Sequence, residues 1–118
     1  MRAATGTPVP RVAEIRETLI HLDFHPENVL LSRDGPVVID WTNARRGEGA
    51  LDVALTWVIG ATSGRLAGKT LLPPYLACFD LEPVRRALAD AAARRIDDPN
   101  VTERERAAVR RLLERALR

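Results

Sequence analysis

In the segment 21–41, two of the carboxylates and the one carboxamide flank short apolar stretches: Asp23, Asn28 and Asp40. Carboxylate and carboxamide oxygens are ligands that suit Mg²⁺, and a carboxylate on a loop can take the proton of a hydroxyl group. A metal bound beside such a base is the arrangement that transfers a phosphoryl group to an alcohol. These residue types therefore indicate phosphoryl-transfer chemistry, provided that the fold brings the three side chains together.

A β-hairpin is the element that must position them. The apolar run Val-Leu-Leu follows Asn28, the run Val-Val-Ile precedes Asp40, and an Arg-Asp-Gly turn signal separates the two. If Gly35 takes the left-handed position of a three-residue loop, Ser32 pairs with Pro36, and Asn28 then lies opposite Asp40. Directly opposed Cβ atoms are about 4.5–5.5 Å apart, which would allow both side chains to bind one Mg²⁺. A slip of one residue in this register would turn one of them to the other face.

Three stretches together resemble a known family. They are His-Leu-Asp-Phe-His-Pro-Glu-Asn-Val-Leu-Leu from residue 21, Val-Val-Ile-Asp-Trp from residue 37, and Gly-Ala-Leu-Asp-Val-Ala at 49–54. The segment 19–59 resembles the aminoglycoside phosphotransferase family of kinase-like small-molecule phosphotransferases. Its first stretch also fits H-x-D-x-x-x-x-N, the catalytic-loop pattern of protein kinases. The resemblance is weaker over the helices that follow.

The resemblance implies a role for each polar residue of the segment. Asp23 would be the catalytic base that orients the acceptor hydroxyl. Asn28 and Asp40 would bind the Mg²⁺ that bridges the phosphates of ATP (or GTP). The acceptor would be a small molecule with a hydroxyl group, and the resemblance extends to enzymes of antibiotic resistance.

Further residues would support or face this centre. His21 would brace the catalytic loop, and Asp52 would anchor the loop from the next helix through hydrogen bonds to its backbone. We expect His25 and Glu27 on the substrate side. Leu22 is a departure from the family pattern, because many members have glycine there, and its side chain would narrow access to the catalytic Asp.

The fold class expected from this pattern is mainly α with a small β-hairpin (α+β), as in a protein-kinase-like C-terminal lobe. We treat 1–118 as one domain with a lead-in at 1–18, a catalytic loop and metal-binding hairpin at 19–41, and a helical subdomain at 50–118. The N-terminal lobe would be missing, since the sequence has no G-x-G-x-x-G and its only lysine, Lys69, lies downstream. We therefore expect an incomplete enzyme that needs an N-lobe partner or self-association.

Apolar periodicity predicts the helices of the subdomain. We expect a buried helix at 50–59, a partly helical stretch at 66–79 interrupted by Pro73-Pro74, and a helix at 82–96. A capping box at 102–105 should open a last helix with inward residues Val109, Leu112, Leu113 and Leu117. Residues 9–17 are expected as a short helix or an irregular lead-in. Residues 64–70 are one residue short of a phosphate-binding G-x-x-x-x-G-K-[ST] motif and are expected as a loop.

Composition narrows the setting of this chemistry. The single cysteine, Cys78, is expected as a buried core thiol in a reducing cytoplasm, and no apolar stretch suits a signal peptide or a membrane span. Residues 85–118 contain ten arginines against six acidic residues, which predicts ion-paired helix faces rather than a nucleic-acid surface. Since such helices are not acidic, a neutral or weakly charged acceptor is as well supported as a polycationic aminoglycoside.

Two other classes of function remain open at the level of sequence. His21, Asp23 and His25 alternate, so on an extended segment they would share one face and bind Zn²⁺ or Fe²⁺ in a hydrolase or oxygenase. That interpretation leaves Pro26 and the pairing of Asn28 with Asp40 unexplained. The third hypothesis is a non-catalytic helical interaction fragment.

Overall fold

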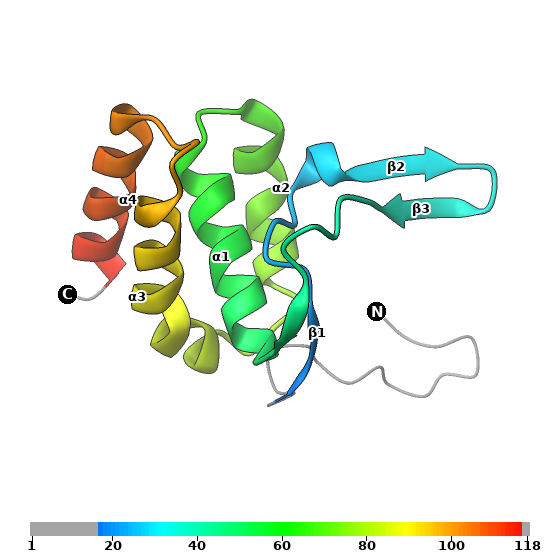
Figure 1. Ribbon diagram of the computed structural model, residues 1–118, viewed down its shortest axis with the longest axis horizontal. Helices are drawn as coiled ribbons and strands as arrows, with labels where there is room; N and C mark the ends of the chain where they lie inside the picture. Colours follow the sequence, from blue (N-terminus) through cyan, green and yellow to red (C-terminus); the bar gives the residue numbers. More distant parts are fainter. Residues whose placement is uncertain (1–16, 117–118) are drawn as a thin grey trace.

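The computed structural model describes residues 17–116, which form four α-helices, four short strands and one 3₁₀ turn (Figure 1). In chain order these are β1 (Thr18–Ile20), η2 (Pro26–Asn28), β2 (Val29–Ser32), β3 (Gly35–Val38), β4 (Arg45–Gly47), α1 (Gly49–Thr62), α2 (Leu66–Leu76), α3 (Leu81–Asp97) and α4 (Glu103–Ala116). The expected mainly α fold with a small β-hairpin is confirmed. The lead-in predicted at 9–17 and the inward Leu117 fall almost wholly outside the described residues.

The helix α1 is the centre of the domain. It packs against α2, α3 and α4 (Figure 1), and eleven of its fourteen residues are buried. Its sequence explains this position, because Asp52 is its only charged residue and apolar side chains lie almost all round the helix. The helix is one turn longer than the segment 50–59 expected from the sequence. Asp52 lies in its first turn, at the end that faces β1.

The hairpin β2–β3 has a two-residue turn rather than the three-residue loop expected from the sequence. Ser32 pairs with Gly35, so the expected pairing of Ser32 with Pro36 is wrong. Pro36 instead pairs with Leu31 at a non-hydrogen-bonded position of the ladder, where its missing N–H costs nothing. The ladder continues past the strands, because the Ile39 N–H donates to the Asn28 carbonyl over 2.8 Å. Asn28 therefore lies opposite Ile39 and not opposite Asp40.

A second pair of strands was not foreseen from the sequence. β1 and β4 pair antiparallel, with Ile20 opposite Arg45, and they lie at the base of α1 (Figure 1). Ile20 is fully buried, and a Cβ built on Gly47 would lie only 2.7 Å from its Cδ1 atom. A side chain at residue 47 would therefore force the Ile20 side chain to shift, so glycine is favoured where β4 pairs with β1. This small sheet positions the two ends of the segment that carries the polar residues.

The helix α2 corrects two expectations. It runs through Pro73 and Pro74 to Leu76 without interruption. The carbonyls that lose their N–H partners belong to Lys69 and Thr70, which are exposed, so water can satisfy them. The loop expected at 64–70 ends at the N-cap residue Arg65, because α2 begins at Leu66. Cys78 is exposed rather than buried, because it follows the end of α2 while its neighbour Phe79 packs against the core.

The last two helices close the core. The Asp80 side chain caps α3 by accepting a hydrogen bond from the Glu82 N–H over 3.2 Å. The predicted capping box opens α4, where the Glu105 N–H donates to Thr102 Oγ1 over 3.1 Å. Val109 is fully buried, as expected. None of the described helices combines the length and apolar character needed to cross a membrane.

Candidate active site

The loop between β1 and η2 is held by one face of α1. The Asp52 carboxylate accepts hydrogen bonds from the His21 and Leu22 N–H groups, each over 2.9 Å. One helical turn later, Thr56 Oγ1 donates to the Phe24 carbonyl over 2.9 Å. Residues four apart lie on the same face of a helix, so the hydrogen bonds from Asp52 and Thr56 reach the loop from the same side. Asp23 lies between Leu22 and Phe24, so the backbone on both sides of Asp23 is held by hydrogen bonds to α1.

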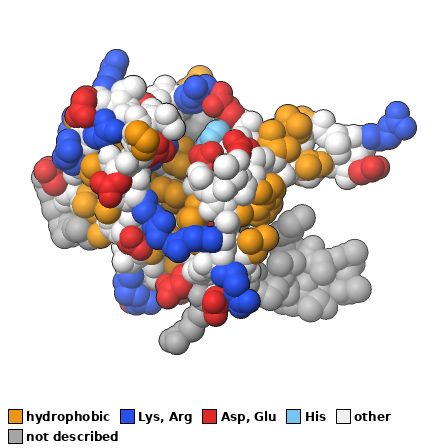
Figure 2. Space-filling model, in the orientation of Figure 1, with side chains coloured by type: hydrophobic (Ala, Val, Ile, Leu, Met, Phe, Trp, Pro, Cys, Tyr) orange, Lys and Arg blue, Asp and Glu red, His pale blue; other side chains and the backbone are white. Residues whose placement is uncertain are grey.

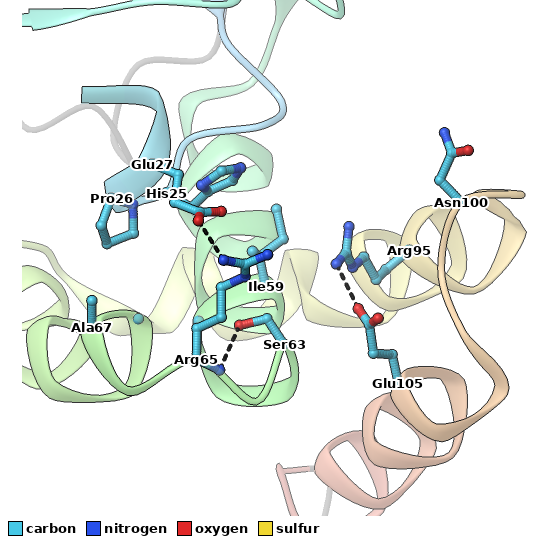
Figure 3. A pocket seen from close by; sticks show the side chains of 12 residues that line it. His25, Pro26, Glu27, Ile59, Ser63, Arg65, Ala67, Arg95, Asn100 and Glu105 are labelled. Carbon is cyan, nitrogen blue, oxygen red and sulfur yellow. Dashed lines mark hydrogen bonds and ion pairs between the residues drawn. The ribbon is translucent and has the colours of Figure 1, made fainter. Parts of the chain in front are cut away.

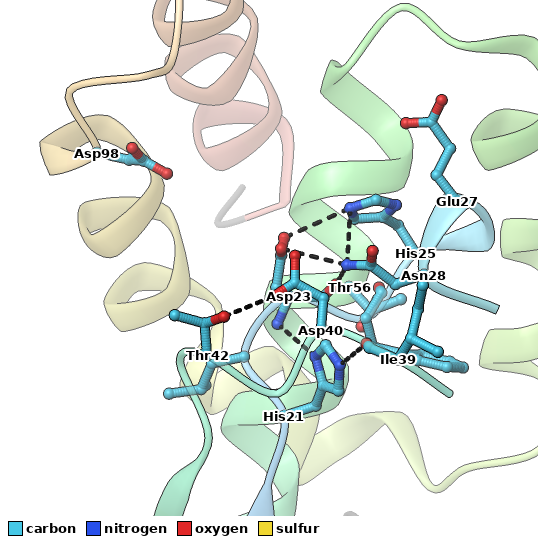
Figure 4. A network of polar contacts seen from close by, with 12 residues as sticks. His21, Asp23, His25, Glu27, Asn28, Ile39, Asp40, Thr42, Thr56 and Asp98 are labelled. Carbon is cyan, nitrogen blue, oxygen red and sulfur yellow. Dashed lines mark hydrogen bonds and ion pairs between the residues drawn. The ribbon is translucent and has the colours of Figure 1, made fainter. Parts of the chain in front are cut away.

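The buried imidazole of His21 joins this loop to the end of the hairpin. Its Nδ1 atom accepts the Asp23 N–H over 3.0 Å, and its Nε2 atom lies 2.8 Å from the Ile39 carbonyl, to which it donates (Figure 4). These two partners require the neutral tautomer with the proton on Nε2. The Trp41 ring covers the imidazole at a centroid distance of 4.6 Å. His21 therefore ties the position of Asp23 to the position of β3.

Leu22 adopts a left-handed backbone with φ +66°. Such a conformation costs an L-residue about 1–2 kcal/mol relative to glycine. Two features offset this cost: the Leu22 N–H bonds to Asp52, and the side chain is buried in the core. The backbone at this position thus favours glycine, and the hydrogen bond and the buried side chain explain why leucine is accepted.

Asp23, His25 and Asn28 come together in front of this loop (Figure 4). The Asn28 Nδ2 atom donates to the Asp23 carbonyl over 2.8 Å and lies 3.2 Å from Asp23 Oδ2. His25 Nε2 lies 3.3 Å from the same amide nitrogen and 3.5 Å from Asp23 Oδ1. The Asn28 side chain is buried, whereas the Asp23 carboxylate is partly open to solvent. The arrangement orients the Asp23 carboxylate from two sides and leaves it accessible.

Asp40 lies near Asp23 and Asn28 because of a backbone conformation that was not foreseen from the sequence. It follows β3 with a left-handed φ of +59°, which turns the chain away from the line of the hairpin. Its side chain lies on the same side of the loop as those of Asp23 and Asn28 (Figure 4). A hydrogen bond of 2.6 Å from Thr42 Oγ1 lowers the pKa of the exposed Asp40 carboxyl, and the Thr42 backbone N–H lowers it further. Asp40 is accordingly ionised at neutral pH.

The oxygen atoms of Asn28 and Asp40 suit a hard cation. Because Asn28 Nδ2 points at Asp23, the Oδ1 atom is left as the acceptor, and no protein donor reaches it within residues 17–116. One carboxylate oxygen of Asp40, Oδ1, accepts the hydrogen bond from Thr42, and Oδ2 is left to bind a cation. One amide oxygen and one carboxylate oxygen are ligands that Mg²⁺ accepts, with water and phosphate completing its shell. The donor set therefore fits magnesium.

The alternative metal site does not fit. Both ring nitrogens of His21 are engaged by the backbone, so neither is left for Zn²⁺ or Fe²⁺. Across the described part of the chain, no three His, Cys, Asp or Glu side chains are placed to hold a metal ion. The interpretation with His21, Asp23 and His25 as ligands fails at its first residue.

Two clefts adjoin the loop and share Ile59 and Arg95. One has a volume of about 270 Å³ and is lined by Leu22 and Asp23. The other, of about 280 Å³, is lined by His25 and Glu27 (Figure 3). Glu27 is exposed there and forms an ion pair with Arg65, the residue before α2. The structure thus places His25 beside Asp23 but turns Glu27 toward the second cleft.

Comparison with known proteins identifies the class. Residues 3–88 match the model of the phosphotransferase enzyme family (APH), and the chain belongs to this family. Thiamine kinases of Salmonella paratyphi B and Salmonella newport are 32% identical to it over 77 residues. The aligned segment covers 65% of this chain but only 25% of each relative, so the chain spans about a quarter of their length. No solved structure gives a significant match.

Sequence reasoning missed two of the residues that shape the site. Thr56 is one, although a polar residue four positions after Asp52 in an apolar helix is a signal that could have found it. Thr42 is the other, two residues after Asp40. A threonine in a turn is common, and only the structure shows its hydroxyl group at the carboxylate.

Proposed function

We propose that this chain supplies the acceptor side and the metal ligands of a kinase-type phosphotransferase that transfers phosphate from ATP or GTP to a hydroxyl group of a small molecule. The observation that carries the proposal is the fixed Asp23 carboxylate, oriented by Asn28 and open to a cleft. Membership of the phosphotransferase enzyme family supports the reaction class. The likeness to thiamine kinases supports a small-molecule acceptor.

In this proposal each residue acts through the contacts described above. Asp23 accepts a hydrogen bond from the acceptor hydroxyl and takes its proton as the phosphoryl group arrives. Asn28 and Asp40 would hold Mg²⁺, which would neutralise charge on the nucleotide phosphates. His25 stands next to Asp23, where it orients the carboxylate or contacts the acceptor.

Two residues set the position of the base without touching the reacting atoms. Asp52 holds the backbone before Asp23 through two hydrogen bonds to N–H groups. His21 fixes the distance between the loop and the hairpin. Glu27 would act on the acceptor through the second cleft, where it is paired with Arg65.

The nucleotide would be clamped by groups outside these elements. We propose that a glycine-rich loop and a lysine come from a further segment or from a partner, and that they pack over the hairpin. Apolar side chains on the hairpin and beside it support this, because Leu30, Leu31 and Trp41 are about half or more exposed (Figure 2). A cytoplasmic setting, in which ATP is abundant, fits the single cysteine.

A complete enzyme that contains this segment tests the assignment. Asp23→Asn should abolish most turnover and leave nucleotide binding nearly unchanged, because this carboxylate faces the acceptor. Asp40→Ala should instead remove Mg²⁺-dependent nucleotide binding. Asp34→Asn, at the exposed tip of the hairpin, is a matched control that removes a carboxylate without touching the site. If Asp23 and Asp40 substitutions had interchangeable effects on turnover and binding, the division of roles would be wrong.

The isolated chain provides a second test. Without a phosphate clamp, the loss of several kcal/mol of transition-state stabilisation is expected, and each 1.36 kcal/mol is about tenfold in rate. Residues 1–118 should therefore bind MgATP weakly and show no measurable phosphotransferase activity. Steady-state turnover that disappears in Asp23→Asn would show that the chain completes its own site.

A further inference from the structure

The cleft beside Asp23 defines where an acceptor can lie. Its floor is apolar and is formed by Leu22, Leu55 and Ile59. With a volume of about 270 Å³, it can take a molecule of a few to about ten non-hydrogen atoms in contact with the walls. If the hydroxyl group of such a molecule binds Asp23, the rest of the molecule contacts the side of the cleft formed by α3 and β4.

That side of the cleft is basic. It is lined by three arginines from two elements, namely Arg45 at the start of β4 and Arg94 with Arg95 in the last turns of α3. Apart from Asp23, the only acidic side chain lining the same cleft is Asp98. Three arginines and two aspartates, Asp23 and Asp98, thus line the space available to the acceptor, and the basic side chains are in excess. An ammonium group would meet repulsion there, and an anionic group would meet donors.

Two of the arginines already have acidic partners, which lie mainly outside the cleft. Arg95 is largely buried, and its Nη2 atom binds Glu105, which lies outside this cleft and in the neighbouring one (Figure 3). Its Nη1 atom lies 4.0 Å from Asp98, and its buried Nε–H has no acceptor among the described residues. Arg94 pairs loosely with Asp90 over 3.7 Å on the outer side of α3.

Arg45 is the most available of the three. It is exposed, and within residues 17–116 it forms no ion pair with an acidic side chain. Its neighbour Arg46 instead pairs with Glu17, the residue before β1. An exposed guanidinium group that faces a cleft can approach a bound anion without breaking an existing contact, and bidentate binding of carboxylate or phosphate is its preferred geometry.

We propose, on the basis of the function proposed above, that the phosphate acceptor is a small hydroxylated acid. Its carboxylate or phosphate group binds to Arg45 and Arg95, and its hydroxyl group meets Asp23. The anionic oxygens are the shared chemistry of both kinds of acid. This assignment sets the acceptor apart from cationic alcohols such as thiamine and from polycationic aminoglycosides.

Binding of simple anions to residues 1–118 tests the proposal without phosphoryl transfer. Inorganic phosphate and acetate, as separate arms, are titrated into ¹⁵N-labelled protein and followed by the backbone amide signals of Leu22, Asp23 and Ile59. Thiamine is the cationic arm. We expect phosphate, acetate or both to shift these signals, and the tighter anion identifies the group that the site prefers. Shifts confined to α4, which borders another basic hollow with Lys69 and Arg111, would overturn the assignment.

Three variants make the test specific. Arg45→Gln should weaken anion binding by about tenfold or more, because a hydrogen bond to a charged group is lost. Arg86→Gln is the matched control, since it removes the same charge from α3 where Arg86 pairs with Glu82 and does not line this cleft. Equal affinities in these two variants would refute the site. Arg95→Gln should also weaken binding, with folding checked by circular dichroism.

A fourth variant separates this inference from the proposed function. Asp23→Asn removes a negative charge from the cleft, so it should strengthen anion binding while abolishing turnover in a complete enzyme. If the anions bind as expected and turnover survives Asp23→Asn, the function is wrong and the anion site stands. If turnover is lost but thiamine shifts the cleft signals and the anions do not, the acid class is wrong and the function stands.

Discussion

Thr56→Val provides the most informative test of how the loop that carries Asp23 is held. Valine has nearly the same volume as threonine, so the main effect of the substitution is to delete the hydrogen bond from Thr56 Oγ1 to the Phe24 carbonyl. Thr56 is buried, and the bond joins α1 to the loop over thirty-two residues of sequence. Its loss should therefore be felt at Asp23, the residue before Phe24.

The size of the effect follows from the hydrogen bond. A neutral intramolecular hydrogen bond contributes about 1 kcal/mol net, which is a factor of about five in an equilibrium constant. Opening of the loop should become about fivefold more frequent. The two bonds from Asp52 to His21 and Leu22 stay in place, so the global fold should persist. In a complete enzyme the freed base is displaced from its working position, and kcat should fall more than KM rises.

A control of the same chemistry is present on the same helix. Thr62 is equally buried, and its hydroxyl group donates over 2.6 Å to the Val58 carbonyl within α1. Thr62→Val should cost less stability, because the Val58 carbonyl keeps the backbone hydrogen bond of the helix, and it should leave the loop alone. Amide hydrogen exchange of Leu22 and Phe24 is the assay, with urea unfolding as the measure of global stability. If both variants accelerated loop exchange equally, or neither did, Thr56 would not be a positioning residue.

Three other substitutions test separate features of the structure. Leu22→Gly relieves about 1–2 kcal/mol of left-handed strain but forfeits about 1.5–3 kcal/mol of side-chain burial, so urea unfolding should show a small net destabilisation; a clear gain in stability would contradict this balance. Thr42→Val removes the main cause of the lowered pKa of Asp40, and a carboxyl titration by NMR should show that pKa rising toward its ordinary value. Since the folded-state pKa of Asp40 is depressed, its contribution to stability is present at neutral pH and is lost as the pH falls through that pKa; Thr42→Val should weaken this dependence, and an unchanged titration would contradict the assignment. Gly47→Ala places a Cβ against the buried Ile20 and should cost about 1–3 kcal/mol by the same urea assay, whereas no loss would mean that β4 shifts freely.

Local patterns in the amino-acid sequence determined much of this protein. The helices follow from apolar periodicity and from caps such as Thr102, because helix formation depends on neighbours three and four residues apart. The spacing of His21, Asp23 and Asn28 indicated the chemistry, since a short loop keeps nearby residues close together. The hairpin was also foreseen, because two β-favouring runs flank a turn signal.

Register and long-range contacts were decided only by the tertiary structure. A change of one residue in the turn moved the partner of Asn28 from Asp40 to Ile39, and the left-handed backbone of Asp40 then turned its carboxylate back toward the site. The pairing of β1 with β4 and the hydrogen bond from Thr56 to the Phe24 carbonyl join residues 25 or more positions apart. No local pattern encodes these contacts, because they form only when packing of α1 against the loop makes them the arrangement that satisfies buried polar groups.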